Sequence, residues 1–243
     1  MIIERSMQQD WLSNTYLVAD EQGGKAVVID AGGPCGPLLE AAERLSVDVQ
    51  TLLLTHHHHD HVAEASAWSG AEVLAHPVEA ELIDRVDRTI EPGDTIEVGG
   101  LRIETLLTPG HTAGMLNFVV NGTDVFTGDT LFKRSVGGVR APGSTSFEDL
   151  RTSIMEVLMA LPHETRVHPG HTDPTTIGDE WENNSFVRLW RGLDDEGDEP
   201  CRVEGQEATL VLWAPDYDGG HKAWVRWNDG SDDIVPGSRV SRE

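Results

Sequence analysis

The stretch at residues 55–65, THHHHDHVAEA, places five histidines and one aspartate within six consecutive positions. Imidazole nitrogens and carboxylate oxygens are side-chain groups that bind zinc and iron in proteins. The run lies inside the chain, follows the apolar segment VQTLLL and is interrupted by Asp60. A purification tag would normally sit at a terminus, so the pattern favours a metal site.

The spacing within the run separates two groups of donors. His56 and His58 follow a strand-like segment, and residues two apart on an extended chain face the same side. These two imidazoles can therefore converge on one ion. The loop that follows can turn Asp60 and His61 toward a second ion.

Three further donors stand in short loops after predicted strands. They are His111 in TPGHTAG, Asp129 in FTGDTLF and His171 in HPGHTD. A glycine precedes each donor and permits the tight turn that directs its side chain inward. Layered α/β proteins commonly assemble a site from loops at the ends of several strands. We therefore expect these three residues to join the histidine run.

The first third of the chain alternates strand-like and helix-like segments, which must position these donors. The segments NTYLVAD, KAVVIDAGG, VQTLLLT and EVLAH predict strands, the first two of them paired. The segments GPLLEAAERLSV, VAEASAWSG and PVEAELIDR predict helices. This order is typical of an α/β protein built from layered sheets and helices.

The second half resumes with strands and then helices. Two hairpins are predicted, one around Gly99 and Gly100 and one around Asn121 and Gly122. SFEDLRTSIMEVLMALP predicts an amphipathic helix that Ser146 can cap. TRVHPGHT predicts a strand, and IGDEWENNSFVRLWRG predicts another helix.

The composition changes toward the C-terminus. We expect a catalytic domain over residues 1–192, an acidic linker over 193–200 and a small module over 201–243. The module alternates apolar and polar residues and resembles a small SH3-like β-barrel. A segment of about 43 residues rarely holds a core alone, so it should pack against the main domain. Its tryptophans, Trp213, Trp224 and Trp227, are expected in a core.

Composition also restricts the partners. The net charge of −24 opposes binding to nucleic acid and to anionic membrane surfaces. Cys35 and Cys201 cannot build a disulfide framework, which favours a reducing compartment. No segment approaches the roughly 18 apolar residues of a membrane helix, and the first residues show no apolar signal core. We expect a cytoplasmic protein that acts on a small molecule; its oligomeric state is left open.

The motifs THHHHDH, PGHT, GDTLF and a second PGHT, in this order, resemble those of the metallo-β-lactamase superfamily. Within it, NTYLV, VVIDAGG, GDTLF and PGHTDPTTIGDE resemble the glyoxalase II branch. The resemblance covers the main domain. It implies a four-layer αββα fold of the α/β class and two metal ions.

The resemblance assigns the seven donors to these ions. The first ion would be held by three imidazoles, those of His56, His58 and His111. The second would be held by Asp60, His61 and His171, with Asp129 bridging the two. We expect zinc, with iron or manganese as alternatives.

Three other histidines near the motifs have lesser expected roles. His57 and His59 occupy the variable positions of the first motif and should point away from their neighbours. They are expected to face solvent or to support ligands from outside. His168 is expected at most to support a ligand.

The resemblance also implies the reaction. A hydroxide bridging two divalent ions would hydrolyse an acyl bond, with a thioester of the S-2-hydroxyacyl thiol type as substrate. Asp60 could orient that hydroxide. Lys133, Arg134 or Arg140, in the segment after GDTLF, could bind a substrate carboxylate, and exposed surface charge is an equally good interpretation of them.

Other functions stay open. Persulfide dioxygenases resemble this branch and use one iron, for which the ligands here would be His56, His111 and Asp129. The segment GDTLFKRS favours the hydrolase. A lactonase or β-lactamase activity is a further alternative, and so is a metal-stabilised scaffold without enzymatic activity.

Overall fold

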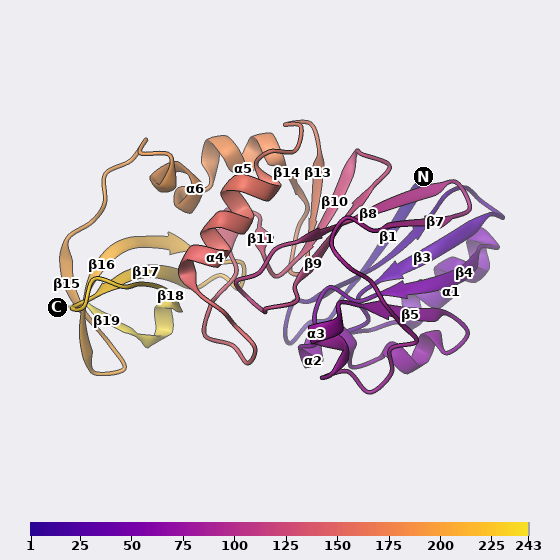
Figure 1. The fold of residues 1–243 in the computed structure, drawn as a ribbon, viewed down its shortest axis with the longest axis horizontal. Coiled ribbons are helices and arrows are strands. Elements are labelled where there is room, and N and C mark those ends of the chain that lie inside the picture. Colours follow the sequence, from indigo (N-terminus) through magenta and orange to yellow (C-terminus); the bar gives the residue numbers. More distant parts are fainter. Residues whose placement is uncertain (243) are drawn as a thin grey trace.

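Two six-stranded sheets form the centre of the computed structural model, which describes residues 1–242 (Figure 1). The first sheet has the order β1 (Ile2–Met7), β2 (Asn14–Ala19), β3 (Lys25–Ile29), β4 (Asp48–Leu53), β5 (Glu72–Ala75) and β6 (Arg88–Thr89). The second has the order β14 (Thr175–Thr176), β13 (Arg166–Pro169), β10 (Asp124–Gly128), β9 (Leu116–Val120), β8 (Leu101–Leu107) and β7 (Thr95–Val98). The expected strands and both expected hairpins of this part are present.

Three apolar clusters show that the layers follow the order helix, sheet, sheet, helix. Residues of both sheets, such as Val27 and Phe118, share one buried cluster. The outer face of the first sheet packs on α1 (Gly36–Leu45) through Leu38. The outer face of the second packs on α4 (Phe147–Thr152) through Leu150. The strands β2, β9 and β10 are buried on both faces, as expected for strands that lie between two layers.

Two helices expected in the first half are much shorter in the structure. Residues 59–68 form α2 (His59–Val62) and the 3₁₀ turn η1 (Ala65–Trp68). The Glu64 N–H donates to the carbonyl of Ala31 at 2.7 Å, so it is withdrawn from a helical ladder. The next helix, α3, covers only Pro77–Ala80. In the segment expected to be helical, Val78 and Leu82 remain exposed, and without burial a short helix gains little stability.

The helices that cover the second sheet also differ from expectation in detail. Ser146 caps α4 as predicted, accepting from the Asp149 N–H at 3.1 Å, and the helix continues as a π-helical turn, η2 (Ser153–Leu158). The last expected helix is two helices, α5 (Ile177–Asn183) and α6 (Ser185–Trp190). Between them Asn184 is extended, and its side chain accepts from the Phe186 N–H at 3.0 Å. This cap starts the second helix in a new direction.

The C-terminal residues form a separate five-stranded antiparallel sheet, here called the C-terminal sheet. Its order is β18 (Asp232–Pro236), β17 (His221–Trp227), β16 (Gln206–Pro215), β15 (Glu199–Val203) and β19 (Val240–Arg242), with the 3₁₀ turn η3 (Gly237–Arg239) before β19. β15 begins at Glu199, inside the segment expected to be a linker. The sheet packs against α4, where the rings of Trp224 and Phe147 lie 4.9 Å apart (Figure 1). Trp224 is buried, whereas Trp213 and Trp227 are half-buried.

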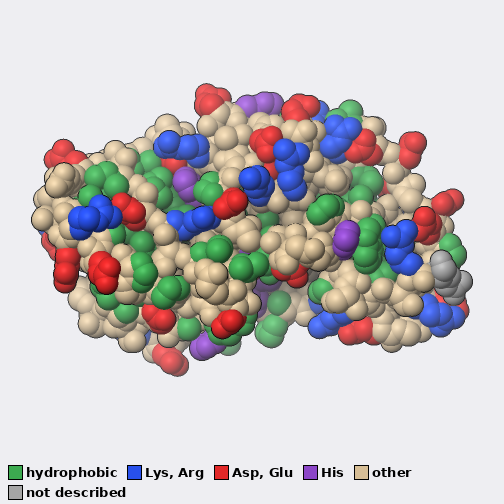
Figure 2. Space-filling view, turned by 180° about the vertical axis from the view of Figure 1, so that it is seen from behind, with side chains coloured by type: hydrophobic (Ala, Val, Ile, Leu, Met, Phe, Trp, Pro, Cys, Tyr) green, Lys and Arg blue, Asp and Glu red, His purple; other side chains and the backbone are tan. Residues whose placement is uncertain are grey.

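The surface carries both signs of charge despite the acidic excess. Figure 2 shows acidic and basic side chains interspersed over one face of the molecule. Many of the exposed arginines pair with carboxylates, as Arg102 does with Glu104 at 3.0 Å. Within residues 1–242, no helix is long and apolar enough to cross a membrane.

One buried carboxylate joins the two parallel strands β10 and β13. Asp124 accepts from Arg166 at 2.7 Å and from His168 at 2.8 Å. Burial disfavours its ionised form, but hydrogen bonds from His168, Arg166 and Thr123 outweigh burial and hold the pKa of Asp124 below its ordinary value of 3.8. The carboxylate therefore stabilises the fold above that value, and the stabilisation is lost as the pH falls through the lowered pKa.

We expect Asp124→Asn to lower the free energy of unfolding at pH 7 by about 1–3 kcal/mol, because charge-assisted hydrogen bonds to a buried group are lost. Denaturant unfolding of both proteins between pH 7 and pH 3 would measure this. The difference should stay constant down to about pH 5 and narrow below about pH 4. A difference that widens on acidification would contradict the assignment.

Candidate metal centre

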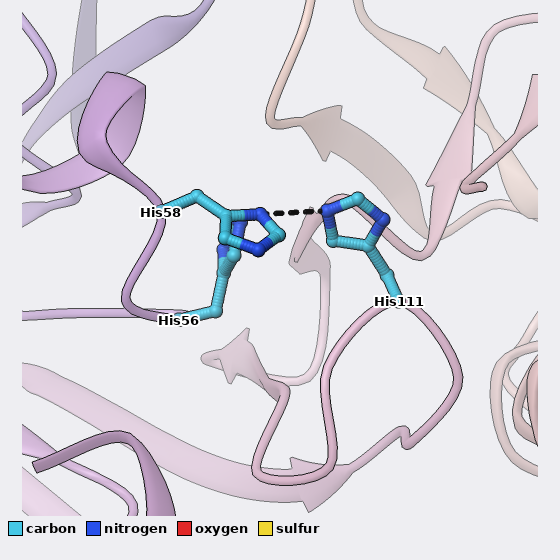
Figure 3. Close-up of side chains that lie close together, drawn as sticks. All are labelled: His56, His58 and His111. Carbon is cyan, nitrogen blue, oxygen red and sulfur yellow. Dashed lines mark hydrogen bonds between the residues drawn. The ribbon is translucent and has the colours of Figure 1, made fainter. Parts of the chain in front are cut away.

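All seven predicted donors meet at one end of the paired sheets, where β4, β8, β10 and β13 end. The seven residues form three overlapping groups, and within each group the potential ligand atoms lie within 4.8 Å of one another. The groups are His56, His58 and His111; His56, His61 and Asp129; and Asp60, His61 and His171. Figure 3 shows the first group, in which His58 Nδ1 and His111 Nε2 lie 3.0 Å apart. Residues separated by more than a hundred positions thus share one small volume.

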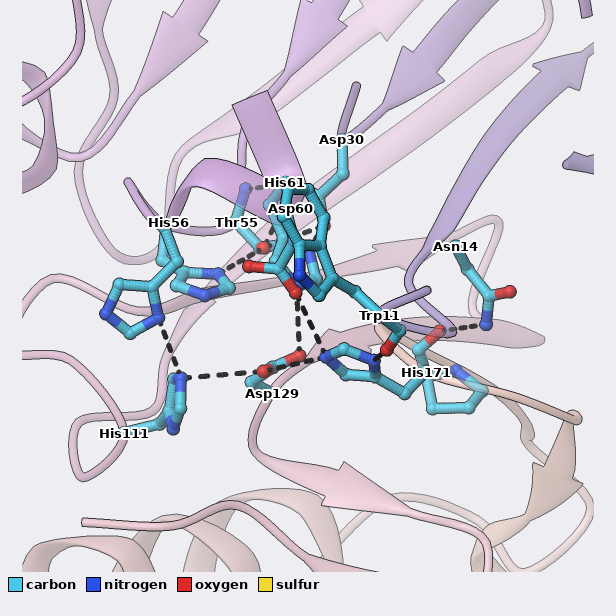
Figure 4. A network of polar contacts seen from close by, with 12 residues as sticks. Trp11, Asn14, Asp30, Thr55, His56, Asp60, His61, His111, Asp129 and His171 are labelled. Atoms are coloured by element: carbon cyan, nitrogen blue, oxygen red, sulfur yellow. Dashed lines mark hydrogen bonds and ion pairs between the residues drawn. The ribbon is translucent and has the colours of Figure 1, made fainter. Parts of the chain in front are cut away.

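Asp129 stands between the two groups of histidines. Its carboxylate oxygens lie 3.2 Å from His171 Nε2, 3.3 Å from His61 Nε2 and 3.4 Å from His111 Nε2 (Figure 4). The residue is only 6% exposed. One carboxylate in contact with imidazoles of both groups is placed where a bridging ligand would have to be.

The glycine beside a donor is required by close packing in at least one loop. A Cβ on Gly170 would lie 2.3 Å from Asp129 Oδ1 and 2.8 Å from the backbone of Gly128. Any larger residue before His171 would therefore push the two strand ends apart. Gly128 itself has a φ of +45°, a conformation that glycine adopts at little cost.

Each of the five clustered imidazoles has one ring nitrogen fixed by a group outside the donor set. These contacts are His56 Nδ1 with the Thr55 hydroxyl (3.0 Å), His58 Nε2 with the Pro142 carbonyl (2.8 Å), His61 Nδ1 with Asp30 (2.9 Å), His111 Nδ1 with the Gly138 carbonyl (2.8 Å) and His171 Nδ1 with the Trp11 carbonyl (2.9 Å). The other nitrogen is left for the cluster. Such outer contacts orient metal ligands in proteins.

The inward atoms fit a metal ion. His56 Nε2 is buried and has no hydrogen-bond partner among residues 1–242. His61 Nε2 and Asp129 Oδ1 lie 3.3 Å apart, but neither has a partner in hydrogen-bond geometry. Buried polar atoms almost always have partners, and imidazole and carboxylate donors are those that zinc binds. A divalent cation would satisfy all three atoms.

Electrostatics favour the cation-binding forms of His56, His111 and Asp129, but not that of His61. Burial lowers the pKa of His56 well below its ordinary value and lowers that of His111 to about 4. Burial opposes ionisation of Asp129, but His171 and His61 outweigh it and lower its pKa well below its ordinary value. Burial likewise opposes protonation of His61, whose pKa Asp129 and Asp30 nevertheless raise. The two carboxylates thus favour a proton on His61, and a cation bound there would take its place.

Two buried carboxylates that support this cluster are not singled out by the sequence. Asp30 accepts from the Thr55 N–H at 2.8 Å, from the Thr55 hydroxyl and from His61 Nδ1. Glu79 accepts from the backbone N–H of Gly114 at 2.8 Å and from that of His57 at 3.0 Å. Asp30 follows the apolar strand residues KAVVI, and a carboxylate directly after a buried strand is the signal that could have indicated it.

The remaining histidines near the motifs lie outside the donor set. His57 Nδ1 makes a short contact with Glu79, so this side chain helps to fix the loop that carries His56 and His58. His59 is exposed, and its ring packs edge-on against Trp11 at 5.4 Å. His168 pairs with Asp124 and stacks on Phe126 at 4.6 Å.

The three basic candidates for substrate binding lie in different settings. Arg134 pairs with Asp179 at 3.0 Å, and Arg140 lies 3.4 Å from Asp233 and 3.6 Å from Glu204. Lys133 is exposed. In the described part of the chain, none of the three makes a hydrogen bond or ion pair with the seven donors.

Comparisons with known proteins show the family that the chain resembles. The family described as the metallo-beta-lactamase superfamily matches residues 9–84 and 63–171. A probable polyketide biosynthesis zinc-dependent hydrolase, BaeB of Bacillus velezensis, is 30% identical over 76% of this chain and 86% of its own. A hydroxyacylglutathione hydrolase of Acidiphilium cryptum is 31% identical over 67% of this chain and 71% of its own. The crystal structure of ETHE1 from Myxococcus xanthus has a TM-score of 0.70 at 30% identity, covering 77% of this chain and 84% of that one.

The contact between Asp30 and His61 should strengthen metal binding, because it orients the imidazole of His61. We expect Asp30→Asn to weaken zinc binding by about 10–100-fold, because the outer hydrogen bond that orients a ligand loses its charge. Competition with a chromogenic chelator would measure the affinity. Asp124→Asn is the matched control, since it also breaks a carboxylate–imidazole pair but outside the cluster. Equal affinities in the two variants would contradict the assigned role of Asp30.

Proposed function

Because this chain belongs to the metallo-β-lactamase superfamily, within its glyoxalase II-like branch, we propose that it hydrolyses thioesters of the S-2-hydroxyacyl thiol type. The observation that carries the proposal is the convergence of seven donors on one site. Hydrolase names among the relatives support the reaction class. The name of the Acidiphilium relative supports an acyl-thiol substrate.

We propose two divalent cations, with zinc as the metal. His56, His58 and His111 would hold one, and the remaining donors, with Asp129 between the groups, would hold the other. When bound, two such ions make hydroxide available near neutral pH and polarise a substrate carbonyl. The zinc-dependent relative supports the metal, and the complete second group of donors supports a second ion.

Asp60 has the position needed to orient the attacking water. Its side chain is 24% exposed, whereas that of Asp129 is 8% exposed. Its Oδ2 lies 3.5 Å from His171 Nε2, so it belongs to the cluster and is also partly open to solvent. A carboxylate accepts hydrogen bonds only, and Asp60 can therefore hold the O–H of a water so that its lone pair faces the acyl carbon. No serine or cysteine nucleophile is required.

Among the basic candidates, we propose Lys133 for a substrate carboxylate. Arg134 and Arg140 are already held in ion pairs, and Lys133 is exposed in the turn between β11 (Leu131–Phe132) and β12 (Ser135–Val136). This hairpin directly follows Asp129. We also propose a reducing compartment, because Cys35 and Cys201 are buried and unpaired.

The proposal predicts that removing either kind of ligand stops turnover. We expect His58→Ala and Asp129→Ala to lower kcat/KM for S-lactoyl thiol conjugates by more than about 100-fold, beyond the effect of losing an outer contact. His163→Ala is the control, since His163 is exposed and outside the cluster. Elemental analysis should show two zinc ions in the wild type and fewer in the two ligand variants.

The same preparations separate the alternatives. Near-normal rates in either ligand variant would contradict the metal assignment. One iron per chain with rapid oxygen uptake on a thiol persulfide would identify the dioxygenase instead. Turnover of lactones or β-lactams without thioester turnover would replace the substrate class and leave the hydrolase assignment in place.

A further inference from the structure

The C-terminal sheet reaches the metal centre through one hairpin. β16 and β17 pair up to Pro215 and His221, and the turn between them carries Tyr217. The Tyr217 ring stacks on the imidazole of His171, with centroids 4.4 Å apart and planes 20° apart. It also meets the ring of Phe132 at 4.8 Å. A residue of the C-terminal sheet therefore covers one of the candidate metal ligands.

Polar contacts fix the tip of this hairpin to the loop after Asp129. Asp216 Oδ1 accepts from the Ser135 hydroxyl at 2.7 Å and from the Tyr217 N–H at 2.8 Å. Lys222 Nζ lies 3.2 Å from the same carboxylate and donates to the Val136 carbonyl at 2.5 Å. Lys222 is only 5% exposed. A charge that is buried to this extent is tolerated only when it is paired, so the tip is held in one arrangement.

The apolar core continues across the same junction. Val211, Ala214 and Trp224 of the C-terminal sheet share a buried cluster with Leu150 and other residues of the main domain. Closely packed cores resist relative sliding of their parts, so the shared cluster keeps Tyr217 in place relative to His171.

The position of Tyr217 suits contact with a bound molecule. The residue is half-buried, and its hydroxyl makes no hydrogen bond to residues 1–242. A tyrosine hydroxyl is protonated at neutral pH and can donate. Its ring offers a rigid apolar face at small cost in conformational entropy. The neighbouring Asp60, whose Oδ2 lies 3.5 Å from His171 Nε2, has a side chain that is 24% exposed.

We propose that Tyr217 is a substrate-positioning residue that the C-terminal sheet supplies to the active site, where its ring and hydroxyl hold the acyl-thiol substrate beside the metal ligands. This inference rests on the proposed function for the class of substrate. It gives the C-terminal sheet a direct part in substrate recognition, besides its packing role.

Kinetics of the zinc-loaded full chain test the proposal. We expect Tyr217→Phe to raise KM for S-lactoyl thiol conjugates roughly 3–10-fold, as the loss of one hydrogen bond would. Tyr217→Ala should raise KM further and lower kcat/KM by about 100-fold, because a misplaced substrate reacts slowly. Tyr217→Leu provides a second variant if the alanine protein does not fold. Zinc content should be unchanged in all of them.

Trp213→Ala is the matched control. Trp213 stacks on His221 with centroids 4.9 Å apart and planes 20° apart, so it reproduces the ring contact within the same sheet but on a histidine outside the cluster. Its kinetics should equal those of the wild type. Unchanged kcat/KM in Tyr217→Ala would overturn the proposal. A loss of activity that follows a loss of zinc would also overturn it, because Tyr217 would then only support His171.

A binding measurement separates this proposal from the proposed function. Calorimetry with a non-hydrolysable thioether analogue of the S-lactoyl conjugate reports positioning without turnover. Weaker binding by Tyr217→Ala than by the wild type supports the proposal even if the wild type hydrolyses no thioester, a result that would refute only the proposed reaction. Equal binding by the two proteins, or no binding by the wild type, overturns it.

Discussion

A buried negative charge surrounded by imidazoles is the constraint on which this structure depends. Asp129 is nearly inaccessible to solvent and lies within 3.4 Å of three histidine nitrogens. An isolated carboxylate would be strongly destabilised at such a position. Its neighbours therefore have to carry compensating charge, either as a proton on His61 or as metal ions. The folded chain is arranged to accept cations, and the outer contacts of each imidazole determine which nitrogen faces them.

The two-sheet architecture explains how such a site is assembled from distant segments. The strands β4, β8, β10 and β13 all end at the same end of the paired sheets, and each is followed by a loop that carries at least one donor. The strands themselves are fixed by apolar layers on both faces. A rigid scaffold with functional loops at one end is a common solution in layered α/β proteins. The loops need glycine where the strand ends approach closely, as at Gly170.

The sequence indicates the seven residues that lie together at this site, because their chemistry is carried by residue type and by order along the chain. The apolar periodicity of the central strands and both hairpins is equally local, and these elements are confirmed. The strand β1 was not expected, because residues such as Glu4 and Arg5 give no apolar alternation. The helix expected over residues 77–85 is shorter in the structure, and the one expected over 177–192 is two helices. Periodicity alone does not tell whether a partner surface covers the apolar stripe or whether Asn184 will cap a new helix.

The contacts least visible in the sequence are those made across the tertiary structure. Asp30 and Glu79 are ordinary acidic residues in their local segments, and only the fold brings them to the histidines that they hold. Tyr217 lies in a turn of the C-terminal sheet, more than forty residues after the last donor, His171. Its place against His171 depends on the docking of that whole sheet, which no local pattern encodes.

The shared core at the junction couples the unfolding of the C-terminal sheet to that of the main domain. Phe147 and Leu150 on α4 are covered jointly by the main domain and by residues of the C-terminal sheet. During synthesis, the apolar face of α4 therefore stays partly uncovered until the last forty or so residues have left the ribosome. Cooperative units follow shared burial rather than boundaries in the sequence, so thermal unfolding should proceed in a single transition that includes the loops carrying the seven donors.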